Sequence, residues 1–340
     1  MREINIGELP TEIIKLQDLR IIRFGMSPMY SDFTENATAA CLIGTTCLPC
    51  LSAMRSPCLP WAAAALISAM AMSELYKLTF SCCTYGYGMK VPKGIEAMQN
   101  LEILMHVDVT RTGSRAIEGL GKLTQLRKLG MIWARMSEKK GKKVCASLEK
   151  LTSLRSLSLI ADGDGGRIKR NDDRAACWVH SISSPPPLLE NLSVVGYIGP
   201  ILQWVSLLND LVKVKLFRNG STASEVVTSL EGLPNLRKLL FSTLHDMSEH
   251  DKIVFREKVF PKLLILKFNG LSKSTEVMFE RGTAPLMEEA SFLYCKSNIH
   301  GLTHLPRLKQ VTLDAGADDN LRGMIQEQVD AHPNHPALRM

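Results

Sequence analysis

Four cysteines have the spacing that could support metal binding or thiol chemistry. Cys47 and Cys50 form a C-x-x-C pair of the kind found in redox and zinc sites, and Cys41 and Cys58 flank it. A zinc site would need a second well-spaced pair, usually with histidine, but no histidine lies between Cys41 and Cys58. We therefore expect no metal and no cofactor here.

Histidines are the other residues with possible catalytic or ligating chemistry, and three closely spaced pairs occur. These are His245 and His250, His300 and His304, and His332 and His335. The first pair borders the acidic segment HDMSEHD, which we interpret as a solvated loop, and the other two are expected to be structural or exposed. The motifs GxxxxGK[ST], GxSxG and HExxH are absent from the sequence. These observations predict a protein that is not an enzyme.

Charge and hydropathy narrow the class of protein further. The formal net charge is +7 over 340 residues, and acidic residues are interspersed throughout, so nucleic acid is not an expected ligand. The most apolar stretch, residues 59–72, is shorter than the roughly 20 residues that a bilayer requires. The N-terminus MREINIGELP precedes no apolar run. We expect no membrane span, a cytoplasmic location and reduced thiols.

A repeated apolar pattern predicts the elements that position these residues. In LTSLRSLSL, Leu151, Leu154, Leu157 and Leu159 lie at offsets 0, 3, 6 and 8, which is the spacing of a leucine-rich repeat. The same frame begins at Leu16, Met98, Leu123, Pro186, Leu208, Leu233, Phe260, Ala284 and Leu305, with a weaker match from Met72. A turn leads into a short strand, and the residues at offsets 6 and 8 face the core. The predicted fold is an α/β leucine-rich-repeat solenoid, curved, with short parallel strands on the concave face and helices and loops on the convex face.

The frames also predict the domain organisation. Residues 1–25 form a first repeat whose front end has no visible cap, and residues 26–71 form an irregular Cys/Pro/Ala-rich insert, interpreted as disordered or misannotated. Residues 72–317 form the repeat array, in which the frames from Pro186 onward begin 21 to 27 residues apart. Residues 318–340 are expected to be a helical cap and tail, with the helix ending near Pro333.

Side chains between the buried strand positions should line the concave face. In frame these are Ile21 and Arg23, Lys128 and Gly130, Ser156 and Ser158, Asn191 and Ser193, Lys213 and Lys215, Lys238 and Leu240, Ile265 and Lys267, Glu289 and Ser291, and Gln310 and Thr312. The candidate protein-binding residues are Lys128, Lys213, Lys215, Lys238 and Lys267. They would suit an acidic or phosphorylated protein partner. The alternative is that these lysines only keep exposed strands soluble.

Longer runs resemble one particular family. LQWVSLLNDLVKVKLF, LEGLPNLRKLLF, HGLTHLPRLKQVTL and the tail VDAHPNHPAL resemble the C-terminal repeats of plant coiled-coil, nucleotide-binding, leucine-rich-repeat disease resistance proteins, in their cereal form. VPKGIEAMQNLEIL followed by VDV is similar to the junction of their early and later repeats. The resemblance covers about residues 1–25 and 72–340. Such receptors also contain a coiled coil and an ATP/ADP switch module, whose phosphate-binding motif this sequence lacks.

The resemblance implies a sensor or regulatory module of plant innate immunity that binds protein. The partner would be a pathogen effector, a host defence protein or, in trans, a nucleotide-binding module. One alternative is the substrate receptor of a ubiquitin ligase, which would need an adaptor-binding helical module where residues 1–25 are a repeat. A nonfunctional truncated receptor fragment is the other alternative.

Overall fold

The computed structural model describes residues 8–25, 77–81, 88–134, 136–161, 177–196, 203–217, 221–242, 251–314 and 317–340. The chain divides into two compact units, Met1–Leu154 with Asp164–Arg167, and Arg155–Gly163 with Ile168–Met340. The predicted insert at 26–71, with its Cys47 and Cys50 pair, lies outside the described residues, as do His245 and His250.

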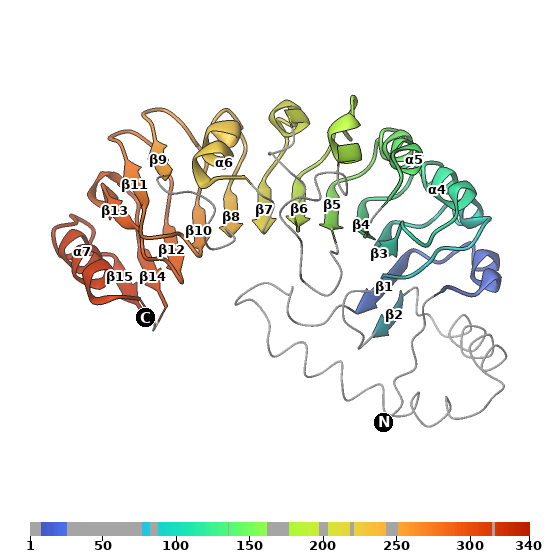
Figure 1. The fold of residues 1–340 in the computed structure, drawn as a ribbon, viewed down its shortest axis with the longest axis horizontal. Helices are drawn as coiled ribbons and strands as arrows, with labels where there is room; N and C mark the ends of the chain where they lie inside the picture. Colours follow the sequence, from blue (N-terminus) through green and yellow to red (C-terminus); the bar gives the residue numbers. More distant parts are fainter. Residues whose placement is uncertain are drawn as a thin grey trace, which may run out of the picture. The chain divides into compact units, whose positions relative to one another are not determined.

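The first unit contains one parallel sheet with short helices beside it (Figure 1). Its elements are η1 (Thr11–Lys15), β1 (Ile21–Gly25), β2 (Lys77–Ser81), η3 (Ile95–Ala97), β3 (Ile103–Asp108), α4 (Ser114–Leu120), β4 (Lys128–Trp133) and α5 (Glu138–Leu148). A strand begins where each frame predicts one. Leu120 and Leu148 end the two α-helices and are buried, because they supply the apolar edge of each helix.

The strand order in this unit is β2-β1-β3-β4, which differs from the order along the chain. β1 pairs directly with β3, whereas β2 pairs with the other edge of β1. The backbone N–H groups of Glu102 and Ile103 donate to the carbonyl of Arg20, just as those of Arg127 and Lys128 donate to Glu102. The repeat from Leu16 therefore stacks on the repeat from Met98 as if the two were consecutive.

His106 stands at offset 8 of the frame from Met98, where other repeats have an apolar residue, and the structure leaves it only partly buried. Its φ of 63° places it in the left-handed region, where the register between β3 and β4 shifts. Because the chain gains a residue at this bulge, Val107 takes the buried position with 0% exposure. Beyond the bulge, Val107 also bridges to Met89.

The second unit contains the remaining frames. Its elements are β5 (Ser156–Ala161), η5 (Cys177–Ser181), β6 (Asn191–Val195), η6 (Gln203–Leu207), β7 (Lys213–Phe217), α6 (Ala223–Leu230), β8 (Lys238–Ser242), β9 (Asp251–Phe255), β10 (Ile265–Asn269), β11 (Thr275–Phe279), β12 (Glu289–Leu293), β13 (Asn298–His300), η7 (Leu302–His304), β14 (Gln310–Leu313), α7 (Asp319–Asp330) and β15 (Ala337–Arg339). Its larger sheet runs in the order β5-β6-β7-β8-β10-β12-β14-β15, and its strand pairs are parallel. The predicted leucine-rich-repeat solenoid is confirmed.

The convex side of this unit differs from the expected helices and loops, because β9, β11 and β13 form a second parallel sheet there (Figure 1). Alternate residues of these strands are buried, among them Phe255 and Phe279, as expected for strands with one face on a core. The ring of Phe255 stacks on Phe279 with centroids 4.7 Å apart, and it meets Phe268 of β10 edge-on at 6.3 Å. Phenylalanine thus fills the space between the two sheets.

Helices cover both edges of the small sheet, since α6 packs against β9 and α7 packs against β13. The Asp251 carboxylate, at the start of β9, accepts hydrogen bonds from the backbone N–H groups of Ala223 (3.0 Å) and Ser224 (3.3 Å) at the start of α6. The expected C-terminal helix is α7, which ends at Asp330, ahead of Pro333. After it, β15 adds a strand to the larger sheet that the sequence did not predict.

Candidate protein-interaction surface

The larger sheet of the second unit places alternate side chains on opposite faces. Val214 and Leu216 of β7 are buried at 0% and 2% exposure, while Lys213 and Lys215, which alternate with them, are partly exposed. We call the outward positions of this sheet the strand face. It comprises Ser156, Ser158, Asn191, Ser193, Lys213, Lys215, Lys238, Leu240, Ile265, Lys267, Glu289, Gln310 and Thr312. Ser291, also predicted here, is instead buried at 3% exposure, in register between Lys267 and Thr312.

Parallel register brings three of the predicted lysines together, and we call Lys213, Lys215 and Lys238 the lysine cluster. Lys213 on β7 lies directly opposite Lys238 on β8. Lys215, two residues along β7, lies opposite Leu240 of β8 and Ser193 of β6. Because neighbouring strands are about 4.8 Å apart, these positions form one compact patch.

The environment of Lys215 disfavours its positive charge. Burial, and to a smaller extent the charge of Lys238, together lower the pKa of this lysine to about 8. The Lys215 side chain is half-buried, and the partly exposed Leu240 lies beside it on β8. The surroundings of Lys215 therefore destabilise the charged form of its side chain relative to the neutral form.

The other two predicted lysines are placed differently. Lys267 of β10 forms an ion pair with Glu289 of β12, with 3.0 Å between Nζ and Oε1. Both side chains of this pair are about one quarter exposed. Lys128 begins β4 in the first unit and is exposed, next to the buried Gly130. The lysine cluster is thus confined to β7 and β8 of the second unit.

Hydroxyl and amide groups continue the strand face on either side of the cluster. β5 and β6 present Ser156, Ser158, Asn191 and Ser193 in paired register. On β14, the Gln310 side-chain amide donates to the Thr312 hydroxyl at 3.0 Å. Such groups can donate and accept hydrogen bonds with a polypeptide laid across the strands.

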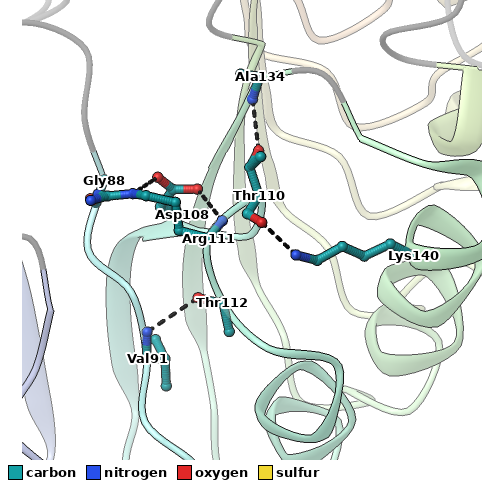
Figure 2. Close-up of polar contacts among 8 residues, drawn as sticks. All are labelled: Gly88, Val91, Asp108, Thr110, Arg111, Thr112, Ala134 and Lys140. Carbon is teal, nitrogen blue, oxygen red and sulfur yellow. Dashed lines mark hydrogen bonds and ion pairs between the residues drawn. The ribbon is translucent and has the colours of Figure 1, made fainter.

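A polar network in the first unit, which sequence reasoning missed, fixes the loop after β3 (Figure 2). The buried carboxylate of Asp108 accepts from the backbone N–H of Arg111 at 2.9 Å and from its Nε at 2.5 Å. The Arg111 guanidinium also donates to the carbonyl of Gly88. Thr112 Oγ1 accepts from the backbone N–H of Val91 at 3.1 Å. These contacts tie the loop to the preceding segment of chain.

The same loop is tied to the following repeat through Thr110 (Figure 2). Its hydroxyl accepts from the backbone N–H of Ala134 at 2.9 Å, and its carbonyl accepts from Lys140 Nζ at 2.5 Å. The pKa of Lys140 is lowered, because the effect of burial exceeds the opposing effect of the Asp108 charge. The sequence does contain a signal for this network. Val107-Asp108-Val109 is followed by polar residues and Gly113, which is typical of a strand that ends in a loop whose side chains hydrogen-bond to the backbone.

The described histidines have structural contacts or are exposed. His304 Nδ1 lies 2.7 Å from the carbonyl oxygen of Phe279. The buried His332 accepts from the Asn334 backbone N–H at Nδ1, which leaves Nε2 as donor to the Leu305 carbonyl at 3.1 Å. Within the described residues, no group of three or more His, Cys, Asp or Glu side chains is arranged to hold a metal ion. Within the same residues, none of the helices is long and apolar enough to cross a bilayer.

Comparisons with known proteins show what the chain is similar to. A family model described as a leucine-rich repeat region matches residues 68–338. Disease resistance protein RPM1 of Arabidopsis thaliana is 24% identical over 223 residues, which cover 66% of this chain and 22% of that protein. Disease resistance protein RGA5 of Oryza sativa subsp. japonica is 23% identical over 265 residues, covering 72% and 23%. The chain thus spans about a fifth of the length of these relatives.

Among solved structures, an internalin of Listeria monocytogenes aligns with a TM-score of 0.37 and 13% identity, over 75% of this chain and 84% of the internalin.

Proposed function

Since the chain belongs to the leucine-rich repeat region family, we propose that it is a non-enzymatic protein-interaction module of plant innate immunity, acting in the cytoplasm. It binds its partner across the strand face. The similarity to two plant disease resistance proteins supports the role in immunity. The partner is a pathogen effector or a host defence protein, or a nucleotide-binding module supplied in trans.

The observation that carries this proposal is the polarity of the strand face. Its side chains are held at fixed spacing by continuous parallel register from β5 to β14, so the surface is ordered before any partner arrives. A preformed surface loses less conformational entropy on binding than a flexible one. Repeat proteins use such extended surfaces to bind other proteins.

The proposal further assigns the chain to the repeat region of a cereal-type receptor, separate from the nucleotide switch. The resemblance of LQWVSLLNDLVKVKLF and VDAHPNHPAL to the cereal form supports this assignment. The printed residues contain no GxxxxGK[ST] motif. We expect the pure chain to show no ATP hydrolysis and no binding of labelled ATP or ADP. Measurable nucleotide binding by the pure chain would contradict the proposal.

The interaction itself is tested by proximity labelling in plant cells with the chain fused to a biotin ligase. The strand-face variant carries Ser158→Arg and Ser193→Arg, which oppose each other on β5 and β6. The matched control carries Thr228→Arg on α6 and Gln326→Arg on α7, both exposed helix positions. We expect labelled proteins that are lost with the strand-face variant and kept with the control, and that bind the purified chain directly. Identical labelling by wild type and both variants would refute a strand-face interaction.

A further inference from the structure

The backbone adopts a left-handed conformation directly after several strands of the larger sheet. Gly196 follows β6 with a φ of 96°, and Gly270 follows β10 with a φ of 81°. Tyr294 occupies the same place after β12, with a φ of 52°. Glycine adopts this conformation without steric cost, whereas a bulky side chain is strained there. Tyr294 therefore costs free energy of folding at a position where two other repeats use glycine.

Contacts with the next repeat hold the backbone of Tyr294 in this conformation. The backbone N–H of Gly270 donates to the carbonyl of Leu293 in the following repeat at 2.9 Å. The N–H of Tyr294 likewise donates to the following repeat, to the Asp314 carboxylate at 2.6 Å. The turn is thus imposed by repeat stacking, and the residue is held in place before any partner arrives.

Core packing does not explain why a tyrosine occupies this position. Phe260 and Ala284 also have positive φ, but both are fully buried, so their burial offsets the strain. Tyr294 is 55% exposed. Lys258 and His335 are exposed residues with positive φ, but their side chains are hydrophilic. Among the described residues, only Tyr294 combines a strained backbone with an exposed large apolar side chain.

We propose that Tyr294 is an anchor residue for the protein partner, whose folded surface has an apolar pocket for the ring and a hydrogen-bond partner for the hydroxyl. This inference rests on the proposed function, because it names a contact at the carboxyl end of the same strand face. Strained residues persist where function uses them, and tyrosine is among the residues that dominate binding energy at interfaces.

The fixed backbone of Tyr294 determines the kind of partner that fits. An exposed ring at a rigid turn is a projection, and its complement is a preformed pocket. A flexible peptide would lose conformational entropy in forming such a pocket, whereas a folded surface has lost it already. The proposal therefore specifies a folded partner and not an extended segment.

The first test separates binding from stability. Tyr294→Gly and Tyr294→Asn introduce residues that tolerate positive φ. We expect the midpoint of chemical denaturation to be no lower in either variant than in wild type, because the strain is relieved. A lower midpoint in both variants would show that the ring serves the packing of the chain itself, and this would overturn the proposal.

The second test measures affinity for the protein that proximity labelling identifies and that binds the purified full chain directly. Isothermal titration should show a loss of about tenfold or more in Tyr294→Asn. The control Leu207→Asn removes another exposed apolar side chain, at the end of η6, and should change affinity by less than about twofold. Tyr294→Phe should retain most of the affinity. Equal losses in the asparagine variants, or a phenylalanine variant as weak as Tyr294→Asn, would overturn the anchor.

Two further results bear on the pocket. Nitration of Tyr294 by tetranitromethane, read by mass spectrometry, should fall severalfold in the complex, and unchanged nitration would overturn burial of the ring. A short peptide from the partner that binds as tightly as the intact protein would overturn the folded pocket. A partner that requires Ser158 and Ser193 but binds Tyr294→Asn as it binds wild type would overturn this inference and leave the proposed function standing.

Discussion

At the scale of single residues, the molecule contains polar groups whose energetic roles oppose each other. Asp108 is buried but satisfied, because its carboxylate accepts two hydrogen bonds from Arg111. Lys215 is half-buried and disfavoured, because its surroundings lower its pKa to about 8. A buried polar group with good partners stabilises a fold, whereas a desolvated charge among like charges destabilises it.

The substitution Lys215→Met should stabilise the chain. In the folded state the pKa is about 8, and in the unfolded state it is close to the ordinary value of 10.5. The lysine therefore costs free energy in full below about pH 8, and this cost disappears as pH rises towards 10.5, where both states are neutral. Chemical denaturation at pH 7 should show a gain of about 1 kcal/mol, allowing for screening of a half-buried group. The gain over wild type should shrink at pH 9.5, and a gain that grows with pH would contradict this account.

The substitution Asp108→Ala should destabilise the first unit. It removes the carboxylate that accepts the backbone N–H and Nε of Arg111 at the end of β3. We expect a loss of about 2–3 kcal/mol in the free energy of unfolding. Urea denaturation followed by circular dichroism measures it, with the exposed Asp210→Ala as a control that should stay within about 0.5 kcal/mol of wild type. Equal stability of the two variants would show that the network is not structural.

At the scale of elements, the convex side of the second unit changes from helix to strand along the array. α6 is followed by β9, β11 and β13, which form their own parallel sheet, and α7 then closes the far edge. The stacked rings of Phe255 and Phe279 lie between this sheet and the main one. Because side chains from both sheets fill this core, the small sheet must be correctly placed on the main sheet for the rings to pack.

Asp251 of β9 caps the start of α6, and Asp251→Ala should weaken the contact between these two elements. Its carboxylate accepts from the first N–H groups of α6, which an alanine would leave without this acceptor. We expect a loss of about 1–2 kcal/mol in the free energy of unfolding, with faster amide hydrogen exchange in the first turn of α6. Asp251→Asn, which keeps an acceptor oxygen, should recover part of this loss. Unchanged exchange in the alanine variant would rule out the capping role.

At the scale of the whole chain, the repeats stack by spatial register and not by strict order in the sequence. β1 lies beside β3, with β2 outside it, so the repeat from Leu16 makes the contacts of a direct neighbour with the repeat from Met98. The side-chain amide of Asn100 donates to the Gln17 carbonyl at 3.2 Å, just as Asn235 donates to Asn209 at 2.9 Å between two later repeats. The two interfaces thus share the same hydrogen bond from an asparagine side chain to the backbone of the neighbouring repeat.

Removal of residues 26–87, which joins Gly25 to Gly88, should therefore preserve the array. The frames at Leu16 and Met98 start 82 residues apart, and the loss of these 62 residues would leave them 20 apart, close to the 21 to 27 of later repeats. Nearest-neighbour stacking determines the stability of a repeat array, so we expect cooperative unfolding with a midpoint at least as high as that of the full chain. Calorimetry measures this, and noncooperative melting or aggregation would show that β2 is required.

The sequence by itself determined the positions of the main strands and the family resemblance, because each repeat is local. Its apolar residues at offsets 6 and 8 fix which side chains enter the core, as at Leu157 and Leu159. Only the tertiary structure decided that Ser291 is buried, that β2 lies outside β1, and that β9 belongs to a second sheet. These features depend on register between segments that are distant in the chain, which no local spacing encodes.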